Sequence, residues 1–179
     1  MNIWHSVNPH RIKKDEFLAC IEISKGSRNK YELDKESGSL ILDRILYTAT
    51  HYPHNYGFIP KTLSQDGDPL DVLVLCSEPI EPLALTAAKP IGVLFMTDGG
   101  KRDEKIIAVC AHDPVYNSYK DITELPPHVS QEISHFFSVY KQLEPNKKTE
   151  VGSMEGREVA EKTIEEAIQS YKDRFAGAF

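Results

Sequence analysis

Three carboxylates lie within six residues of one another at Asp66-Gly-Asp-Pro-Leu-Asp71, directly before an apolar run. Hard divalent cations prefer oxygen ligands, and Mg²⁺ usually takes one or two carboxylates together with water and phosphate oxygens. The glycine and the proline between the acids make a tight bend that can bring the carboxylates together. Acids held so closely repel one another unless a cation offsets their charge. The segment therefore predicts a metal site, with a solvated acidic turn as the alternative interpretation.

Charged residues also gather in two other segments. Asp98-Gly-Gly-Lys-Arg-Asp103 is predicted to be a charged hairpin loop, and Lys105 follows it. Lys30 and Glu32 are two residues apart and share one face of a predicted strand, which Glu22 on the preceding strand could join. Taken alone, the first segment is explained as an exposed charged hairpin and the second as a pair of charges on the protein surface. Buried charges on one face of a barrel, however, are unfavourable unless they have a function.

Two tyrosines, Tyr52 and Tyr56, add hydroxyl groups to this inventory. Phenol hydroxyls donate hydrogen bonds to phosphate oxygens, although core packing explains these residues equally well. Carboxylates, cations and hydroxyls next to predicted strands together favour metal-assisted transfer of a phosphoryl group. In such sites the metals contact carboxylates and phosphates, while Lys and Arg neutralise the remaining negative charge.

The sequence predicts strands in its first two thirds and helices in its last third, and these elements must position the residues named above. Short apolar or alternating runs predict strands in the first two thirds, and turn signals after Asp34 predict a hairpin. Apolar residues at a spacing of three to four predict two helices in the last third. Strands in succession without intervening helices favour an antiparallel barrel or sandwich, and hence a mainly β chain of the α+β class. The predicted strands are 17–23, 30–34, 40–43, 70–76, 90–96 and 105–110, and the predicted helices are 128–143 and 156–175.

Composition limits the classes of function. A length of 179 residues favours one domain over residues 1–179. The formal net charge of -6 argues against nucleic acid or an anionic membrane surface as a partner, because both require a basic face. No apolar run is long enough to cross a membrane, and the N-terminal segment lacks the apolar centre of a signal peptide. Three widely spaced cysteines without metal-type spacing indicate reduced thiols in a cytoplasmic protein.

With these motifs in view, the sequence resembles the soluble family I inorganic pyrophosphatases of the short, bacterial type. Their central motif, D-x-D-P-x-D followed by an apolar residue, stands here as Asp66-Gly-Asp-Pro-Leu-Asp-Val72. The resemblance covers about residues 15–145. The other signatures occur in order as Ile21-Glu-Ile23, Lys30-Tyr-Glu32, Asp43-Arg44, Tyr52-Pro-x-Asn-Tyr-Gly57, Gly92-Val-Leu-x-Met-x-Asp98, Asp103-x-Lys105 and Phe136-Phe-x-x-Tyr-Lys141.

The resemblance implies hydrolysis of inorganic pyrophosphate to two orthophosphates with Mg²⁺ as cofactor. It implies a closed, OB-like five-stranded barrel with two C-terminal helices packed on it, and a homohexamer. By the same resemblance Asp66, Asp71 and Asp103 bind Mg²⁺, with Asp98 and Glu22 supporting or binding further ions. Asp71 would bridge two metals, and a water between them would attack in line.

The resemblance also implies the roles of the remaining site residues. Asp68 would accept the proton of the attacking water as general base, and Glu32 and Tyr52 would line the site. One departure is Gly99, which stands where many relatives carry an acid. The residues that would hold the phosphoryl groups are Lys30, Arg44, Tyr56, Lys105, Tyr140 and Lys141.

Two other functions remain open from the residues alone. A metal-dependent phosphatase for organic phosphates would need an apolar or aromatic pocket beside the acids. A non-enzymatic OB-like binding module would need a basic groove with stacking aromatics, which the acidic balance disfavours.

Overall fold

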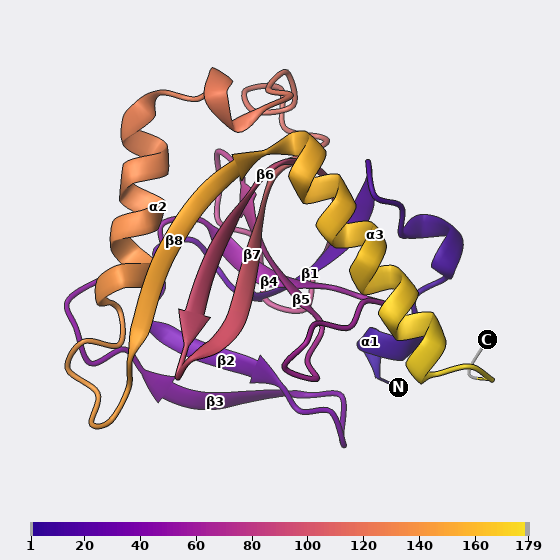
Figure 1. Ribbon diagram of the computed structural model, residues 1–179, viewed down its shortest axis with the longest axis horizontal. Coiled ribbons are helices and arrows are strands. Elements are labelled where there is room, and N and C mark those ends of the chain that lie inside the picture. Colours follow the sequence, from indigo (N-terminus) through magenta and orange to yellow (C-terminus); the bar gives the residue numbers. More distant parts are fainter. Residues whose placement is uncertain (1, 178–179) are drawn as a thin grey trace.

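Five strands close into a ring in the computed structural model, which describes residues 2–177 (Figure 1). Their order around the ring is β1-β4-β5-β7-β6, and a further pairing of β1 with β6 closes it. The predicted OB-like five-stranded barrel of an α+β chain is therefore confirmed. The strands are β1 (Phe17–Ile23), β4 (Asn55–Ile59), β5 (Leu70–Leu75), β6 (Leu85–Asp98) and β7 (Lys101–Cys110).

One pair in the ring departs from the antiparallel expectation. β5 and β7 run parallel, with Asp71 opposite Lys105, whereas the other pairs of the ring are antiparallel. A parallel pair requires a connection that crosses back over the sheet. Here β6 provides that connection, because it lies between β5 and β7 in sequence but beyond β7 in the sheet. This parallel pair places Asp71 beside Lys105.

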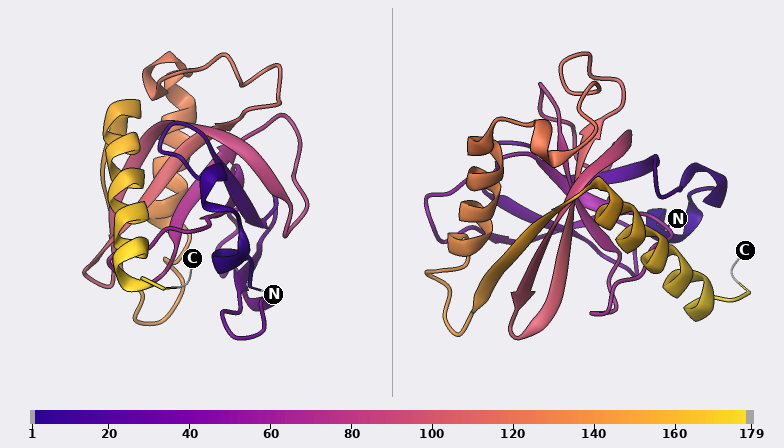
Figure 2. Two further views of the ribbon diagram at one scale, coloured as in Figure 1. Left: turned by 90° about the vertical axis from the view of Figure 1, so that its right-hand side faces the viewer. Right: turned by 45° about the horizontal axis from the view of Figure 1, so that its top comes forward.

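The remaining elements surround the ring. A separate two-stranded sheet pairs β2 with β3, and β8 extends the main sheet beside β6. Helices α2 and α3 lie on opposite sides of the ring (Figures 1 and 2). The bounds are α1 (Ile3–Ser6), η1 (Pro9–Arg11), β2 (Asn29–Leu33), β3 (Leu40–Ile45), η2 (Ile122–Glu124), α2 (Pro127–Val139), β8 (Thr149–Gly156) and α3 (Arg157–Arg174).

Both faces of the strands are buried, which explains their nearly continuous apolar sequence. Val72 and Val74 of β5 face a cluster that includes Ile164 of α3. The alternate residues Leu73 and Leu75 face a second cluster, to which α2 contributes its apolar stripe. The two C-terminal helices are thus packed on the barrel as predicted. No helix among residues 2–177 is long and apolar enough to cross a membrane.

Several elements differ from the sequence prediction, and one of them, the ring strand β4, was not predicted at all. The first helix was predicted to reach Leu143, but α2 ends at Val139 and the chain continues in tight turns that leave Leu143 65% exposed. Strand β8 was not predicted, because its sequence contains two glycines and few apolar residues. The predicted charged loop 98–103 is largely strand, since only Gly99 and Gly100 form the turn between β6 and β7. Both glycines have positive φ, as a two-residue type I′ hairpin turn requires.

The closure of the ring depends on a close approach of two backbones at Gly57. Gly57 of β4 lies opposite Ile21 of β1, where the pairing of the two strands becomes irregular. A Cβ atom at position 57 would stand 1.9 Å from the carbonyl oxygen of Cys20 and 2.8 Å from the Cα of Ile21. Backbone atoms cannot move aside as the end of a flexible side chain can. Glycine is therefore required here for packing rather than for its φ angle.

We predict that Gly57→Ala lowers the free energy of unfolding by about 3 kcal/mol or more, because the methyl group forces β1 and β4 apart. Urea denaturation of the purified variant measures this loss. Gly26→Ala is the matched control, since Gly26 has a φ of +85° but open space around it, and it should cost only about 1 kcal/mol. An unfolding midpoint for Gly57→Ala at or above that of Gly26→Ala would contradict the prediction.

Candidate active site

A cavity of about 280 Å³ lies between the mouth of the ring, the β2–β3 hairpin and the end of α2. Most of the predicted site residues line it, although they come from widely separated parts of the sequence. Side chains that were not predicted also line it, among them Trp4, Tyr31 and Lys35. The predicted residues that line the cavity are Glu22, Lys30, Glu32, Tyr56, Asp66, Asp68, Asp71, Asp98, Asp103, Lys105, Tyr140 and Lys141.

Lys105 occupies the centre of the site. Its Nζ donates to Asp71 Oδ2 at 2.6 Å, to Asp103 Oδ1 at 2.8 Å and to the hydroxyl oxygen of Tyr56 at 3.1 Å. Asp71 is its neighbour across the parallel strands, and Asp103 lies two residues before it on the same face of β7. The side chain of Lys105 is 4% exposed, so its charge is nearly removed from water.

The neighbours of Lys105 keep it protonated. Burial alone would lower its pKa, but Asp71, together with Tyr56 and Asp103, outweighs burial and raises the pKa of Lys105 well above its usual value. Tyr56 also hydrogen-bonds to Asp71, and burial raises the pKa of this phenol, which therefore remains a donor. A fixed ammonium and fixed phenol thus face the cavity beside carboxylates.

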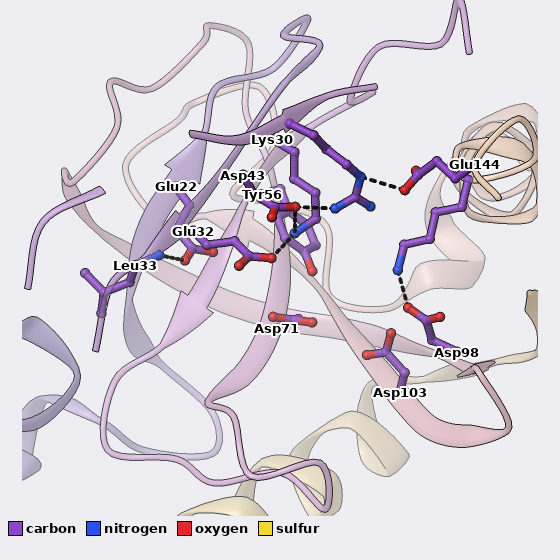
Figure 3. Close-up of polar contacts among 12 residues, drawn as sticks. Glu22, Lys30, Glu32, Leu33, Asp43, Tyr56, Asp71, Asp98, Asp103 and Glu144 are labelled. Atoms are coloured by element: carbon purple, nitrogen blue, oxygen red, sulfur yellow. Dashed lines mark hydrogen bonds and ion pairs between the residues drawn. The ribbon is translucent and has the colours of Figure 1, made fainter. Parts of the chain in front are cut away.

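Glu22 is a buried acid on β1. The Leu33 N–H of β2 donates to its Oε1 at 2.8 Å (Figure 3). Burial and the negative charge of Asp71 raise the pKa of Glu22 to about 8. In the absence of a cation, this carboxyl therefore retains its proton at neutral pH. A nearby cation would favour its ionised form.

The β2–β3 hairpin places cations over one side of the cavity. Lys30 of β2 forms an ion pair with Glu32, and its Nζ is 3.9 Å from Asp43 of β3 (Figure 3). Lys35, in the turn of the hairpin, pairs with Asp68 from the acidic segment. Lys30 and Glu32 share a strand face as expected from their spacing.

The acidic segment and the β6–β7 hairpin complete the opposite side. Asp66 Oδ1 accepts a hydrogen bond from the Asp68 N–H at 2.9 Å, which fixes the bend around Gly67. Burial raises the pKa of Asp66. Asp98, at the end of β6, pairs with Lys141. The Gly99 position next to it has a φ of +58°, so an acidic residue there would adopt a strained backbone conformation.

Two predicted site residues, Tyr52 and Arg44, are absent from the residues that line the cavity. Tyr52, which was expected to line the site, is 1% exposed, and its ring packs against Tyr56 and Phe136 with centroids 5.2 and 4.8 Å away. Tyr52 supports the ring of Tyr56 from within the core, and its expected role in lining the site stays a prediction. Arg44 is also absent from the cavity lining, and its guanidinium contacts Asp43 and Glu144.

The sequence did not reveal the roles of several neighbouring residues. Lys35 and Trp4 lie far from the acidic segment in sequence, although the turn signals around residue 35 place a charge at the tip of the hairpin. Glu144 follows the end of a helix and belongs to none of the motifs. Only the fold brings these side chains to the site.

The acids that line the cavity are all hard oxygen donors, the set that Mg²⁺ prefers. Within residues 2–177, however, no group of three or more His, Cys, Asp or Glu side chains is gathered closely enough to hold an ion as they stand. Lys105 separates Asp71 from Asp103 and supplies the local positive charge. The donor chemistry therefore fits divalent cations, with the carboxylates spread around one cavity.

Comparisons with known proteins agree with this geometry. The family model described as inorganic pyrophosphatase matches residues 19–172. The chain is 49% identical to soluble inorganic pyrophosphatase 2 of Chlamydomonas reinhardtii, over 96% of this chain and 89% of that protein. It is 47% identical to the soluble inorganic pyrophosphatase of Zea mays, over 97% of this chain and 78% of that protein.

Solved structures give the same family. The inorganic pyrophosphatase of Helicobacter pylori superimposes with a TM-score of 0.87 at 47% identity, covering 90% of this chain and 96% of that chain. The inorganic pyrophosphatase of Thermus thermophilus superimposes with a TM-score of 0.91 at 39% identity, covering 95% of this chain and 99% of that chain.

We predict that Glu22 makes the metal-free protein lose stability as the pH rises. Burial and the charge of Asp71 raise the pKa of Glu22 from its usual 4.5 to about 8, so that only the unfolded chain ionises this group between those pH values. Stability is therefore fully retained below pH 4.5 and falls as the pH rises to 8, by roughly 5 kcal/mol at most. Glu22→Gln should remove this loss, as measured by chemical denaturation in EDTA across that range.

Glu32→Gln is the control, because the Glu32 side chain is 54% exposed and should not produce the effect. Parallel stability profiles for the wild type and Glu22→Gln would contradict the assigned burial of this charge.

Proposed function

This chain belongs to the inorganic pyrophosphatase family, and we propose that it hydrolyses inorganic pyrophosphate to two orthophosphates in the cavity described above. The observation that carries this function is the position of Lys105, a buried cation between Asp71 and Asp103 at the centre of a cavity rich in carboxylates. Pyrophosphate is small and highly charged, so its recognition depends on cations and hydrogen-bond donors rather than on apolar burial.

The cofactor we propose is Mg²⁺, held by the carboxylates of the cavity. Bound divalent cations would lower the pKa of water at the site and neutralise charge on the phosphoryl oxygens. The residues proposed as ligands share hard oxygen donors, and their negative charge is costly to gather without cations. They are Asp66, Asp71 and Asp103, with Asp98 and Glu22 in support.

The chain's own side chains would bind the phosphoryl groups and move the proton. Lys30, Lys105 and Lys141 stand around the cavity and would attract the phosphoryl oxygens. Tyr56 and Tyr140 line the same cavity with protonated hydroxyls, because burial raises the pKa of each phenol. These groups would hold the substrate so that one phosphorus faces the acidic segment.

Asp68 is proposed as the general base. Its side chain is 53% exposed at the edge of the cavity, so the carboxylate is accessible to water there. Its partner Lys35 is also exposed. Their ion pair is therefore weak, and water can replace Lys35 beside the carboxylate. Arg44 is proposed as a further phosphoryl-binding cation that approaches from β3. Glu32 lines the same side of the cavity.

The activity is tested by phosphate release. With MgCl₂ the protein should release phosphate from pyrophosphate, and far less from phosphomonoesters such as glycerol phosphate. Asp71→Asn should lower turnover by at least about a hundredfold, because it removes a carboxylate that contacts Lys105 and would bind the cofactor. Circular dichroism should show an unchanged fold, and the exposed control Asp15→Asn should keep wild-type turnover.

Two outcomes would count against this function, and a third would count against the role of Asp71. No release from pyrophosphate at any Mg²⁺ concentration would refute it. Faster release from a phosphomonoester would favour an organic-phosphate phosphatase. Near-normal turnover of Asp71→Asn would remove this residue from the reaction.

We further propose a homohexamer in the cytoplasm, with pyrophosphate and neither nucleic acid nor membrane as its partner. The family resemblance supports the assembly, and the formal net charge of -6 supports the absence of anionic polymers. Sedimentation velocity should give a single species of about six times the 20.2 kDa chain mass. A monomer at micromolar concentration would contradict this assembly.

A further inference from the structure

Glu144 is a buried acid that the proposed function does not use. It lies three residues after Lys141, and its side chain is only 4% exposed. Its Oε1 is 2.7 Å from Nε of Arg44, which belongs to β3. Burial of a carboxylate is costly unless a charged partner compensates it. Arg44 is that partner.

The guanidinium of Arg44 is held from two directions. Asp43 pairs with Nη1, and Glu144 pairs with Nε. The contact with Glu144 is an ion pair rather than an aligned hydrogen bond, and Nη2 has no hydrogen-bond acceptor within residues 2–177. Arg44 is therefore oriented by charge while some of its donor capacity remains unused. Nε and Nη2 are both buried and Arg44 is not among the residues that line the cavity, so the guanidinium serves here to join protein groups.

The same ion pair connects two walls of the cavity. Arg44 belongs to the hairpin that carries Lys30, and Arg44 lies opposite Lys30 in the pairing of β2 with β3. Glu144 belongs to the turn after α2, where its N–H donates to the carbonyl of Lys141 at 3.0 Å. The turn therefore links Glu144 to Tyr140 and Lys141, and the ion pair links this turn to the hairpin.

We propose that Glu144 is a positioning residue, which holds Arg44 and its hairpin against the turn after α2 so that the cations of both walls face one substrate. The inference rests on the proposed function, because it assigns Glu144 to the binding of pyrophosphate. Glu144 does not line the cavity and acts through Arg44. Asp43 cannot replace it, since Asp43 is on the same strand as Arg44 and connects no second wall.

A double-mutant cycle tests whether Glu144 acts through Arg44. Glu144→Gln keeps the shape of the side chain and removes its charge, so the KM for pyrophosphate should rise about tenfold while kcat changes less than about twofold. In an Arg44→Gln background the same substitution should have little further effect on KM. Glu144→Asp, which keeps the charge, should restore part of the affinity. Glu150→Gln, on exposed β8 surface, is the control and should keep the wild-type KM.

A measurement without substrate separates this inference from the proposed function. The Nε–H signal of Arg44 in ¹⁵N NMR should exchange slowly with water in the wild type and faster in Glu144→Gln. If the wild type has no activity, the function fails, while this signal still reports on the contact. An unchanged exchange rate in Glu144→Gln overturns the positioning role. An equal rise in KM in the wild-type and Arg44→Gln backgrounds also overturns it.

Discussion

A buried ammonium between two carboxylates is the constraint on which the rest of this structure depends. Lys105 is nearly removed from water, so its charge persists only because Asp71 and Asp103 lie within 2.8 Å of it. Removing both partners would leave an uncompensated charge in the barrel wall. The fold meets this requirement by pairing β5 with β7 in parallel, which places Asp71 directly opposite Lys105. The chemistry proposed for this site and the charge balance of the barrel wall therefore involve the same contacts.

The rest of the site is arranged around this centre by the ring strands, the β2–β3 hairpin and the turn after α2. The ring strands supply Glu22, Tyr56, Asp71 and Lys105 from a densely packed support, in which Tyr52 and Phe136 back the ring of Tyr56. Ion pairs link the hairpin to the acidic segment through Lys35 and Asp68, and to the turn after α2 through Arg44 and Glu144. In the proposed arrangement Glu144 joins the two outer walls of the cavity.

The sequence predicted much of this fold because the buried strands and helices carry clear apolar patterns. Apolar runs such as 70–76 predicted the ring strands apart from β4, whose segment contains Asn55 and Gly57, and the spacing of apolar residues predicted α2 and α3. Strand β8 escaped prediction because its pairing with β6, rather than its composition, makes it a strand. The end of α2 was predicted too late in the sequence, because tertiary contacts rather than local spacing decide where this helix stops. Leu143 continues the apolar spacing, but the chain turns there to bury Lys141 and Glu144.

By itself the sequence determined which chemical groups the site contains, because motifs such as Asp66-Gly-Asp-Pro-Leu-Asp71 carry side-chain types and spacings that do not depend on distant contacts. It also determined the barrel class through the succession of strands. Tertiary structure alone decided which side chains meet. It placed Lys105 against Asp71, packed Tyr52 against Tyr56 in the core, and paired Arg44 with Glu144. Contacts of this kind depend on strand register and on the desolvation of charges, and both arise only when segments far apart in sequence are packed together.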